Sequence, residues 1–261
     1  MHNFEFVKPS TVAEAVKALG REDAQALAGG HTLLPTMKQR LAAPAVLVSL
    51  TGIADLRGIR REGDALVIGA ATTHAEVARA AAKDFPALAK LAGGIGDPAV
   101  RNRGTIGGSL ANNDPAADYP AAALASGATI ATDRRQIAAD DFFQGLFATA
   151  LEPGEIITAI RLPIPERAAY AKFEQPASRF ALTGAFVAKY PSGVRVAITG
   201  AGENGVFRWA EAERALSANY APSALSGLAV PSDGLIGDLH GTPAYRANLV
   251  RVMTGRAVAA S

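Results

Sequence analysis

Two short glycine-rich segments carry the clearest chemical signal in this sequence. Residues 28–35 read Ala-Gly-Gly-His-Thr-Leu-Leu-Pro, and residues 104–109 read Gly-Thr-Ile-Gly-Gly-Ser. Glycine lets the backbone approach a ligand closely and adopt positive φ, so that successive N–H groups can converge on phosphate oxygens. A hydroxyl side chain follows each glycine pair. Together the segments predict two loops around one anionic ligand, for which a dinucleotide pyrophosphate fits best; ordinary turns are the alternative.

A third glycine segment resembles a nucleotide-binding motif but lacks its context. Residues 94–99, Gly-Ile-Gly-Asp-Pro-Ala, match the G-x-G-x-x-A pattern of a Rossmann turn. That motif follows a strand and opens a helix. Here it follows the helical pattern of residues 86–91 and contains a proline, so we reject the Rossmann interpretation. No P-loop sequence is present, which disfavours a P-loop NTPase.

Two carboxylates lie four residues apart just after the second glycine loop, at Asp114 and Asp118. Three interpretations are open. The pair could act as general acid and base. Asp114 could instead form an Asx turn while Asp118 caps the helix that begins near Pro120. Finally, the carboxylates could accept hydrogen bonds from ribityl or ribose hydroxyls, which suits neighbouring phosphate loops best.

The histidines form no metal-binding motif, so no metal site is expected. His31 lies in the first glycine loop, where it either bonds a phosphate or ribose or only orders the turn. Further along, Lys172 and Arg179 flank Phe173 and Phe180. These residues could stack on a flat ring and pair with phosphate, or could be core aromatics beside surface charges.

Composition limits the classes of function. The chain of 261 residues has a formal net charge of +2 and no Lys/Arg run longer than two, so we expect no nucleic-acid partner. It has no cysteine, so a redox centre in this chain has to be an organic cofactor. The sequence shows neither a signal peptide nor an apolar run of roughly 18 residues. We expect a cytoplasmic protein with, at most, peripheral membrane association.

Hydrophobic periodicity predicts an N-terminal α/β unit over residues 1–55 and a mixed second region over residues 56–168. In the first unit we expect helices after Thr11 and over 33–41, and strands at 4–7, 24–27 and 46–50. In the second region we expect helices after Thr73 and over 86–91 and 120–126, and strands at 56–59, 65–70, 128–131 and 156–162. Both Thr11 and Thr73 begin a Thr-x-x-Glu capping box.

The third region, residues 169–261, has strands followed by helices, which is an α+β pattern. Strands are expected at 180–190 and 194–200, joined by the turn sequence Pro-Ser-Gly at 191–193. Helices are expected at 209–216 and 244–256.

Three motifs in order make the sequence resemble one known family. They are residues 28–35, residues 96–109 (Gly-Asp-Pro-Ala-Val-Arg-Asn-Arg-Gly-Thr-Ile-Gly-Gly-Ser) and residues 114–120 (Asp-Pro-Ala-Ala-Asp-Tyr-Pro). The family is the FAD-binding medium subunit of the molybdenum hydroxylases, and the likeness within it is greatest to subunits of the carbon monoxide dehydrogenase and aldehyde-oxidising type. The resemblance extends from Phe4 to about Arg256.

The resemblance implies an α+β fold, with a two-lobed FAD-binding domain of the vanillyl-alcohol-oxidase/cresol-methylhydroxylase type and a C-terminal α+β domain. It assigns the glycine loops to the FAD pyrophosphate, Asp118 to a cofactor hydroxyl, the Leu162 backbone to the adenine side and Phe180 to the isoalloxazine. No residue is expected to be catalytic. The full set of expected FAD-binding residues is Ala28, Gly29, Gly30, His31, Thr32, Leu33, Thr105, Ile106, Gly107, Gly108, Ser109, Asn113, Asp114, Asp118, Leu162, Lys172 and Phe180.

The resemblance also implies a role in electron relay. A large partner subunit with the molybdopterin cofactor oxidises the substrate, a small subunit with [2Fe–2S] clusters carries the electrons, and FAD in this chain passes them to an external acceptor. The expected assembly is a dimer of heterotrimers. Two alternatives stay open: a stand-alone FAD oxidoreductase on the same scaffold, and a binding or assembly module that has lost its flavin. The substrate and the acceptor are not specified by this chain.

Overall fold

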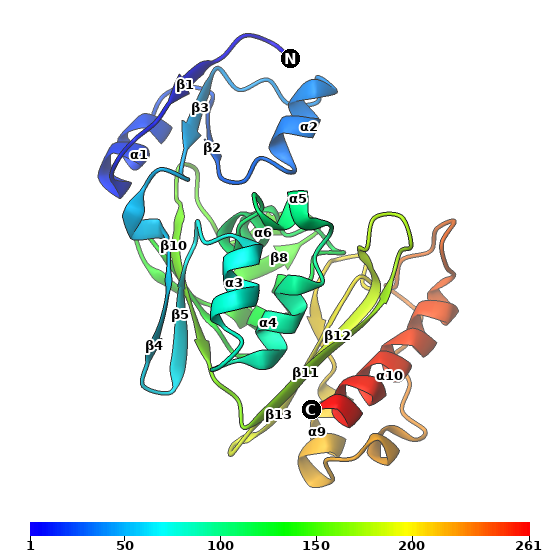
Figure 1. Ribbon diagram of the computed structural model, residues 1–261. Coiled ribbons are helices and arrows are strands. Elements are labelled where there is room, and N and C mark those ends of the chain that lie inside the picture. Colours follow the sequence, from blue (N-terminus) through cyan, green and yellow to red (C-terminus); the bar gives the residue numbers. More distant parts are fainter.

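The computed structural model describes residues 1–261 and contains three main sheets that follow one another along the chain (Figure 1). The first sheet has the order β1-β3-β2, with parallel pairs throughout. Its elements alternate between strand and helix, as predicted: β1 (Glu5–Val7), α1 (Val12–Leu19), β2 (Ala24–Leu27), α2 (Leu33–Lys38) and β3 (Val46–Ser49).

Two details of this first unit differ from the sequence prediction. Helix α2 ends at Lys38 instead of Leu41, because the backbone turns into the left-handed region at Arg40, with φ at 61°. The capping box at Thr11 is half formed. The Thr11 hydroxyl accepts the Glu14 N–H, but the Glu14 carboxylate accepts hydrogen bonds from Ser10 instead of the Thr11 N–H.

The second sheet is antiparallel, with the order β4-β5-β10-β6-β7. Its strands are β4 (Ile59–Glu62), β5 (Ala65–Gly69), β6 (Thr129–Thr132), β7 (Gln136–Ala138) and β10 (Ile157–Pro163), and a separate ribbon is formed by β8 (Phe143–Gly145) and β9 (Ala148–Thr149). The helices between them are η1 (Ala54–Leu56), α3 (His74–Ala80), α4 (Pro86–Gly93), α5 (Pro98–Arg101), α6 (Ile106–Asn112), α7 (Tyr119–Ala125) and α8 (Ala139–Phe142).

The predicted strand at 56–59 is wrong, whereas the capping box at Thr73 is complete. Leu56 ends the 3-10 turn η1, and its carbonyl accepts the Ala71 N–H, so this backbone is not available to a strand before Ile59. At α3, the Thr73 hydroxyl accepts the Glu76 N–H and the Glu76 carboxylate accepts the Thr73 N–H.

The third sheet is antiparallel and lies between two layers of helices (Figure 1). Its order is β11-β12-β13-β14, with β11 (Arg167–Glu174), β12 (Ala181–Tyr190), β13 (Gly193–Thr199) and β14 (Phe207–Arg208), followed by α9 (Ala210–Ala218), η2 (Pro222–Leu225) and α10 (Pro243–Ala260). Helices α9 and α10 contact the sheet on one face, while α4 and α7 contact it from the second unit. Phe186 packs edge-on against Phe85 of that unit, with ring centroids 6.1 Å apart.

The domain limits stay a prediction, although the sheets give their context. The first sheet ends at Ser49 and the second begins at Ile59, which brackets the expected limit after residue 55. The expected limit after residue 168 falls inside β11, so a change of unit fits better between Pro163 and Arg167. None of the helices combines the length and the apolar character needed to cross a membrane.

Glu155 is the buried carboxylate on which we base a stability prediction. Its side chain is fully buried and accepts hydrogen bonds from Thr132, Arg135 and the Glu152 N–H. The hydrogen bonds from Arg135 lower the pKa of Glu155 to about 2. Because this pKa lies below that of an unfolded glutamate, the stabilisation is present above pH ~4.5 and is lost as pH falls toward 2.

Replacing Glu155→Gln should therefore lower the free energy of unfolding at pH 7 by about 1.5–3 kcal/mol. The stability lost by the protein between pH 7 and pH 3 should also become smaller. Urea denaturation at both pH values measures the two effects. Glu62→Gln is the matched control, because Glu62 is 44% exposed in its ion pairs and should change stability by less than about 0.5 kcal/mol. Equal effects of the two substitutions would contradict the assignment.

Gly29 gives a second prediction, since it is where the first unit touches the second. A Cβ at this position would overlap the Arg103 carbonyl oxygen and lie 2.7 Å from Gly104 Cα. Both neighbours are backbone atoms and cannot rotate away. We expect Gly29→Ala to cost about 1–3 kcal/mol of stability in urea denaturation. Gly93→Ala, where the nearest atom is 3.8 Å away, should cause no loss; a Gly29 variant as stable as this control would refute the contact.

Candidate functional site

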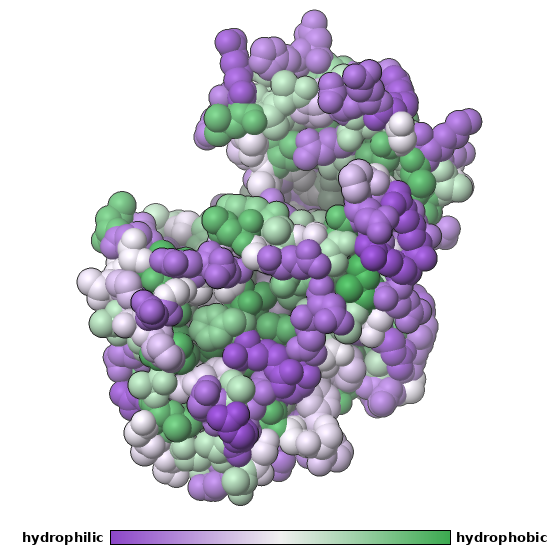
Figure 2. Space-filling model, turned by 180° about the vertical axis from the view of Figure 1, so that it is seen from behind, coloured by the Kyte–Doolittle hydropathy of each residue, from purple (hydrophilic) through white to green (hydrophobic).

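A cavity of about 600 Å³ lies where the first and second units meet, and the third unit contributes residues 178–180 to its wall. The space-filling view shows the hollow between the N-terminal unit and the rest of the molecule (Figure 2). Most of the expected site residues line this cavity: Ala28, Gly29, Gly30, His31, Thr32, Leu33, Thr105, Gly107, Gly108, Ser109, Asp114, Asp118 and Phe180. Four do not line it: Ile106, Asn113, Leu162 and Lys172.

The first glycine loop presents a row of unused backbone donors to the cavity. None of the N–H groups of residues 29–33 donates to an acceptor within the protein, and helix α2 begins its hydrogen bonding with the Leu34 N–H to the Gly30 carbonyl. Gly30 has a φ of +79°, which side-chain-bearing residues rarely adopt. Consecutive free N–H groups in such a turn form a concave site for an anion.

The second glycine loop differs from the first in its backbone hydrogen bonds, and its contact with a pyrophosphate stays a prediction. The N–H groups of Ile106 and Gly107 donate to the carbonyls of Thr72 and Ala70, and that of Gly108 donates to the Thr105 hydroxyl. The glycines serve close packing. A Cβ at Gly107 would lie 2.5 Å from Ala70 Cβ, while one at Gly108 would lie 3.4 Å from Ala28 Cβ, across the gap between the loops.

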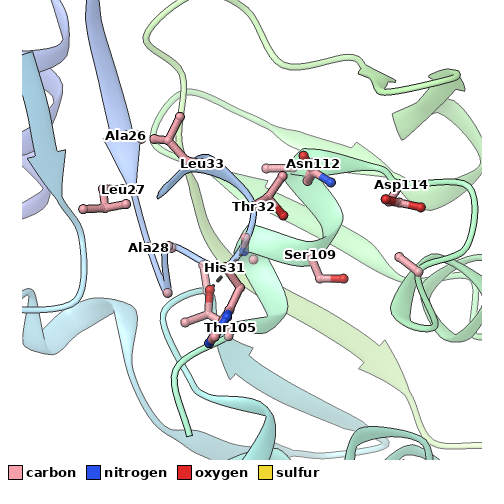
Figure 3. Close-up of a pocket in the computed structure, with 18 of the residues that line it drawn as sticks. Ala26, Leu27, Ala28, His31, Thr32, Leu33, Thr105, Ser109, Asn112 and Asp114 are labelled. Carbon is pink, nitrogen blue, oxygen red and sulfur yellow. Dashed lines mark hydrogen bonds between the residues drawn. The ribbon is translucent and has the colours of Figure 1, made fainter. Parts of the chain in front are cut away.

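Polar side chains complete the wall beside helix α6. Ser109, Asn112 and Asp114 line the cavity, and Figure 3 shows them on the side of the view away from Leu27 and Ala28. The Ser109 hydroxyl has no hydrogen-bond partner in the protein, so it is available to a ligand. Asp114 forms the expected Asx turn, with its carboxylate accepting the Ala116 N–H at 2.9 Å.

Asp118 belongs to a buried charged cluster that joins the second and third units. Its Oδ1 accepts a hydrogen bond from the Tyr170 hydroxyl at 2.6 Å and lies 3.1 Å from Lys172 Nζ. Helix α7 begins at Tyr119, but the Asp118 carboxylate makes no capping bond, so that interpretation is wrong. Burial raises the pKa of Asp118, and Lys172 and Tyr170 oppose this rise. Oδ2 has no partner in the protein and remains free on the cavity wall.

Lys172 connects the cavity to the segment that covers it. Besides its ion pair with Asp118, its ammonium donates to the Gly94 carbonyl at 2.9 Å and to the Arg179 carbonyl at 2.8 Å. These three contacts use the three protons of the ammonium, and Lys172 itself does not line the cavity. Arg179 in turn donates to the Gly96 carbonyl, and the neighbouring Phe180, 49% exposed, lines the cavity.

The other expected residues outside the cavity have structural partners. Asn113 is buried with φ at 44°, and its amide donates to the carbonyls of Gly145 and Ala148 at 2.8 Å, which holds the β8–β9 turn. Leu162 is buried in β10, paired with Leu66. Ile106 is buried in the core. A role for these residues in cofactor binding stays a prediction.

His74 is among the wall residues that the sequence interpretation missed. Its side chain lines the cavity, is 5% exposed, and has an Nδ1 without a hydrogen-bond partner. Burial, and then the nearby His31 and Arg101, lower the pKa of His74 to about 4. The sequence feature that could have drawn attention to His74 is the Thr73 capping box, which makes His74 the first residue of α3. Thr73 also forms an isolated β-bridge with Thr105 of the second glycine loop.

Comparison with known proteins places the chain in a family. A family model described as the FAD binding domain in molybdopterin dehydrogenase matches residues 2–165. The carbon monoxide dehydrogenase medium chain of Afipia carboxidovorans is 39% identical, over 98% of this chain and 96% of the relative. The nicotine 6-hydroxylase medium subunit of Paenarthrobacter nicotinovorans is 33% identical, over 97% and 95%.

A solved structure agrees over the same extent. The reconstituted CO dehydrogenase from Oligotropha carboxidovorans superposes with a TM-score of 0.89 at 35% sequence identity, covering 99% of this chain and 97% of that one. The predicted α+β fold of an FAD-binding subunit is thereby confirmed. The chain belongs to the FAD-binding medium subunits of the molybdenum hydroxylases, as a component of an oxidoreductase.

Proposed function

We propose that this chain binds one FAD in the cavity between its first and second units and relays electrons within a molybdenum hydroxylase complex. A large molybdopterin subunit would pass electrons to a small [2Fe–2S] subunit. This chain would take the electrons from the small subunit and pass them to an external acceptor. The proposed assembly is a dimer of heterotrimers in the cytoplasm. The observation that carries the proposal is the row of five unused N–H groups at residues 29–33, inside a cavity of about 600 Å³.

The residues present fit FAD. The first loop would hold the pyrophosphate through its free N–H groups, which need an anion because no protein acceptor is near. On the opposite side, the absence of a side chain at Gly108 keeps the gap between the loops open, and the Ser109 hydroxyl and Asp118 Oδ2 remain for cofactor hydroxyls. Bound FAD supplies two-electron redox chemistry that no side chain of this cysteine-free sequence can provide.

The protein's own part is binding, orientation and shielding. Phe180 and the segment fastened by Lys172 would cover the part of the cavity that faces the third unit. Asp114 and Asp118 are engaged in an Asx turn and an ion pair, so neither supports the alternative of an acid/base pair. An electron relay needs no such pair. Because this chain would only relay electrons, the substrate would bind to another subunit. Relatives named for carbon monoxide and for nicotine are both compatible with this fold.

The experiment that tests this function is native purification of the chain with its partners. We expect a flavin absorption spectrum, about one FAD per chain released by heat and identified by chromatography, and co-purifying iron–sulfur and molybdenum subunits. FAD in a chain that turns over substrate alone would favour the stand-alone oxidoreductase instead. A chain without flavin, even after incubation with excess FAD, would overturn the proposal.

Gly108→Val gives the sharpest test of the site. The side chain would fill the gap that faces Ala28 and press on the Thr105 hydroxyl, which lies 2.9 Å from the position of a Cβ. We expect FAD affinity to fall by about 100-fold or more, the equivalent of roughly 3 kcal/mol. Flavin fluorescence titration measures it, with circular dichroism to verify folding. Gly93→Ala is the control and should bind FAD normally; normal flavin content in a folded Gly108 variant would remove the second loop from the site.

A further inference from the structure

His74 lies directly beneath the point where the two glycine loops meet. The Cα of Gly104 packs under Gly29 of the first loop, and a Cβ at Gly104 would overlap Nε2 of His74 and lie 2.9 Å from its Cδ2. The three residues therefore form a stack in which glycine is required twice for the imidazole to fit. The backbone N–H of His74 also donates to the Gly104 carbonyl at 3.0 Å, which holds the backbone of His74 against Gly104.

The imidazole is held without a counter-charge. The ring of Tyr119 is 5.3 Å away, and the phenol oxygen of Tyr119 and Nδ1 of His74 are both buried without a hydrogen-bond partner. The charged or titratable groups that influence His74 are His31 from the first loop and Arg101 from α5, and both disfavour its protonation. No carboxylate forms an ion pair with it. A buried polar side chain left unpaired destabilises the protein, and a ligand at this place would offset that cost.

Resting on the proposed function, we infer that His74 couples FAD binding to proton uptake: the neutral imidazole of the empty cavity accepts a proton from solvent when the pyrophosphate binds between the loops above it. The pyrophosphate of FAD is an anion, and the free N–H groups of residues 29–33 place it on the side of the loops that faces the cavity. An opposite charge within a few ångströms favours the protonated ring and raises a pKa by about 1–3 units.

The sign of the effect follows from linkage. In the free protein His74 has a pKa of about 4 and is neutral at physiological pH. In the complex its pKa is higher, so the complex binds more protons than the free protein between the two pKa values. FAD must therefore bind more tightly as pH falls through the pKa of the complex, and the affinity is independent of His74 protonation at higher pH. The same residue would thus add a positive charge beneath the pyrophosphate only when FAD is present.

The test measures FAD affinity of the full chain by fluorescence titration between pH 8 and pH 5.5. We expect the wild-type dissociation constant to fall about threefold to tenfold over this range. His74→Gln retains a polar side chain but cannot titrate, so its dissociation constant should change little with pH. His2→Gln is the control, since it removes an exposed imidazole that does not line the cavity, and it should keep the wild-type pH dependence. Thermal unfolding without FAD verifies that each variant is folded.

A direct readout of the proton is also possible, because the chain has only four histidines. Imidazole NMR signals, with that of His74 assigned from the His74→Gln variant, should give a higher pKa with FAD than without. An unchanged pKa of His74, or a pH dependence that survives in His74→Gln, would overturn the inference while leaving FAD binding intact. Absence of FAD binding by the wild-type chain at every pH would instead overturn the proposed function as well.

Discussion

The close backbone contact between Gly29 and Gly104 is the constraint on which the rest of the site depends. The first and second units have separate sheets, and here they meet without any side chain between them. Two features of the cavity are related to this contact. It brings the free N–H groups of residues 29–33 opposite Gly108, and it leaves room below Gly104 for the imidazole of His74. Glycine at these positions is thus needed for assembly of the units before it is needed for a ligand.

A second interaction, between Lys172 and Asp118, attaches the third unit to the same cavity. An isolated buried charge would be costly, but the ammonium finds one carboxylate and two carbonyls, and the carboxylate also receives the Tyr170 hydroxyl. Lys172 of this cluster donates to the Arg179 carbonyl. The position of Phe180 in the cavity wall therefore depends on a residue that does not itself line the cavity. A flavin partly covered in this way would be shielded from water without being sealed from a partner subunit.

The sequence was sufficient for the local features and insufficient for those that depend on distant partners. The spacing of Thr73 and Glu76 predicted a helix start because a capping box needs only neighbouring residues. The motif at residues 104–109 predicted a close approach correctly but not its partner, since the carbonyls of Ala70 and Thr72 that take up its N–H groups are some 35 residues away in the chain. The side-chain partners of Asn113, the carbonyls of Gly145 and Ala148, are likewise more than 30 residues away in the chain. His74 carried no signal of its own, because its burial arises only when Gly104 packs over it.

The two glycine loops therefore have unequal roles, which bears on how such a subunit binds its cofactor. The first loop provides donors, and because these N–H groups have no acceptor within the protein, it should be the part of the site that gains most from an anion. The second loop mainly provides shape, since the N–H groups of Ile106, Gly107 and Gly108 already have acceptors in the protein and its glycines exclude side chains from the gap. Substitutions in the first loop should act on affinity by displacing its backbone N–H groups, and those in the second through lost space. A cofactor held by backbone donors alone would be insensitive to pH, whereas the buried imidazole of His74 would make its binding respond to pH.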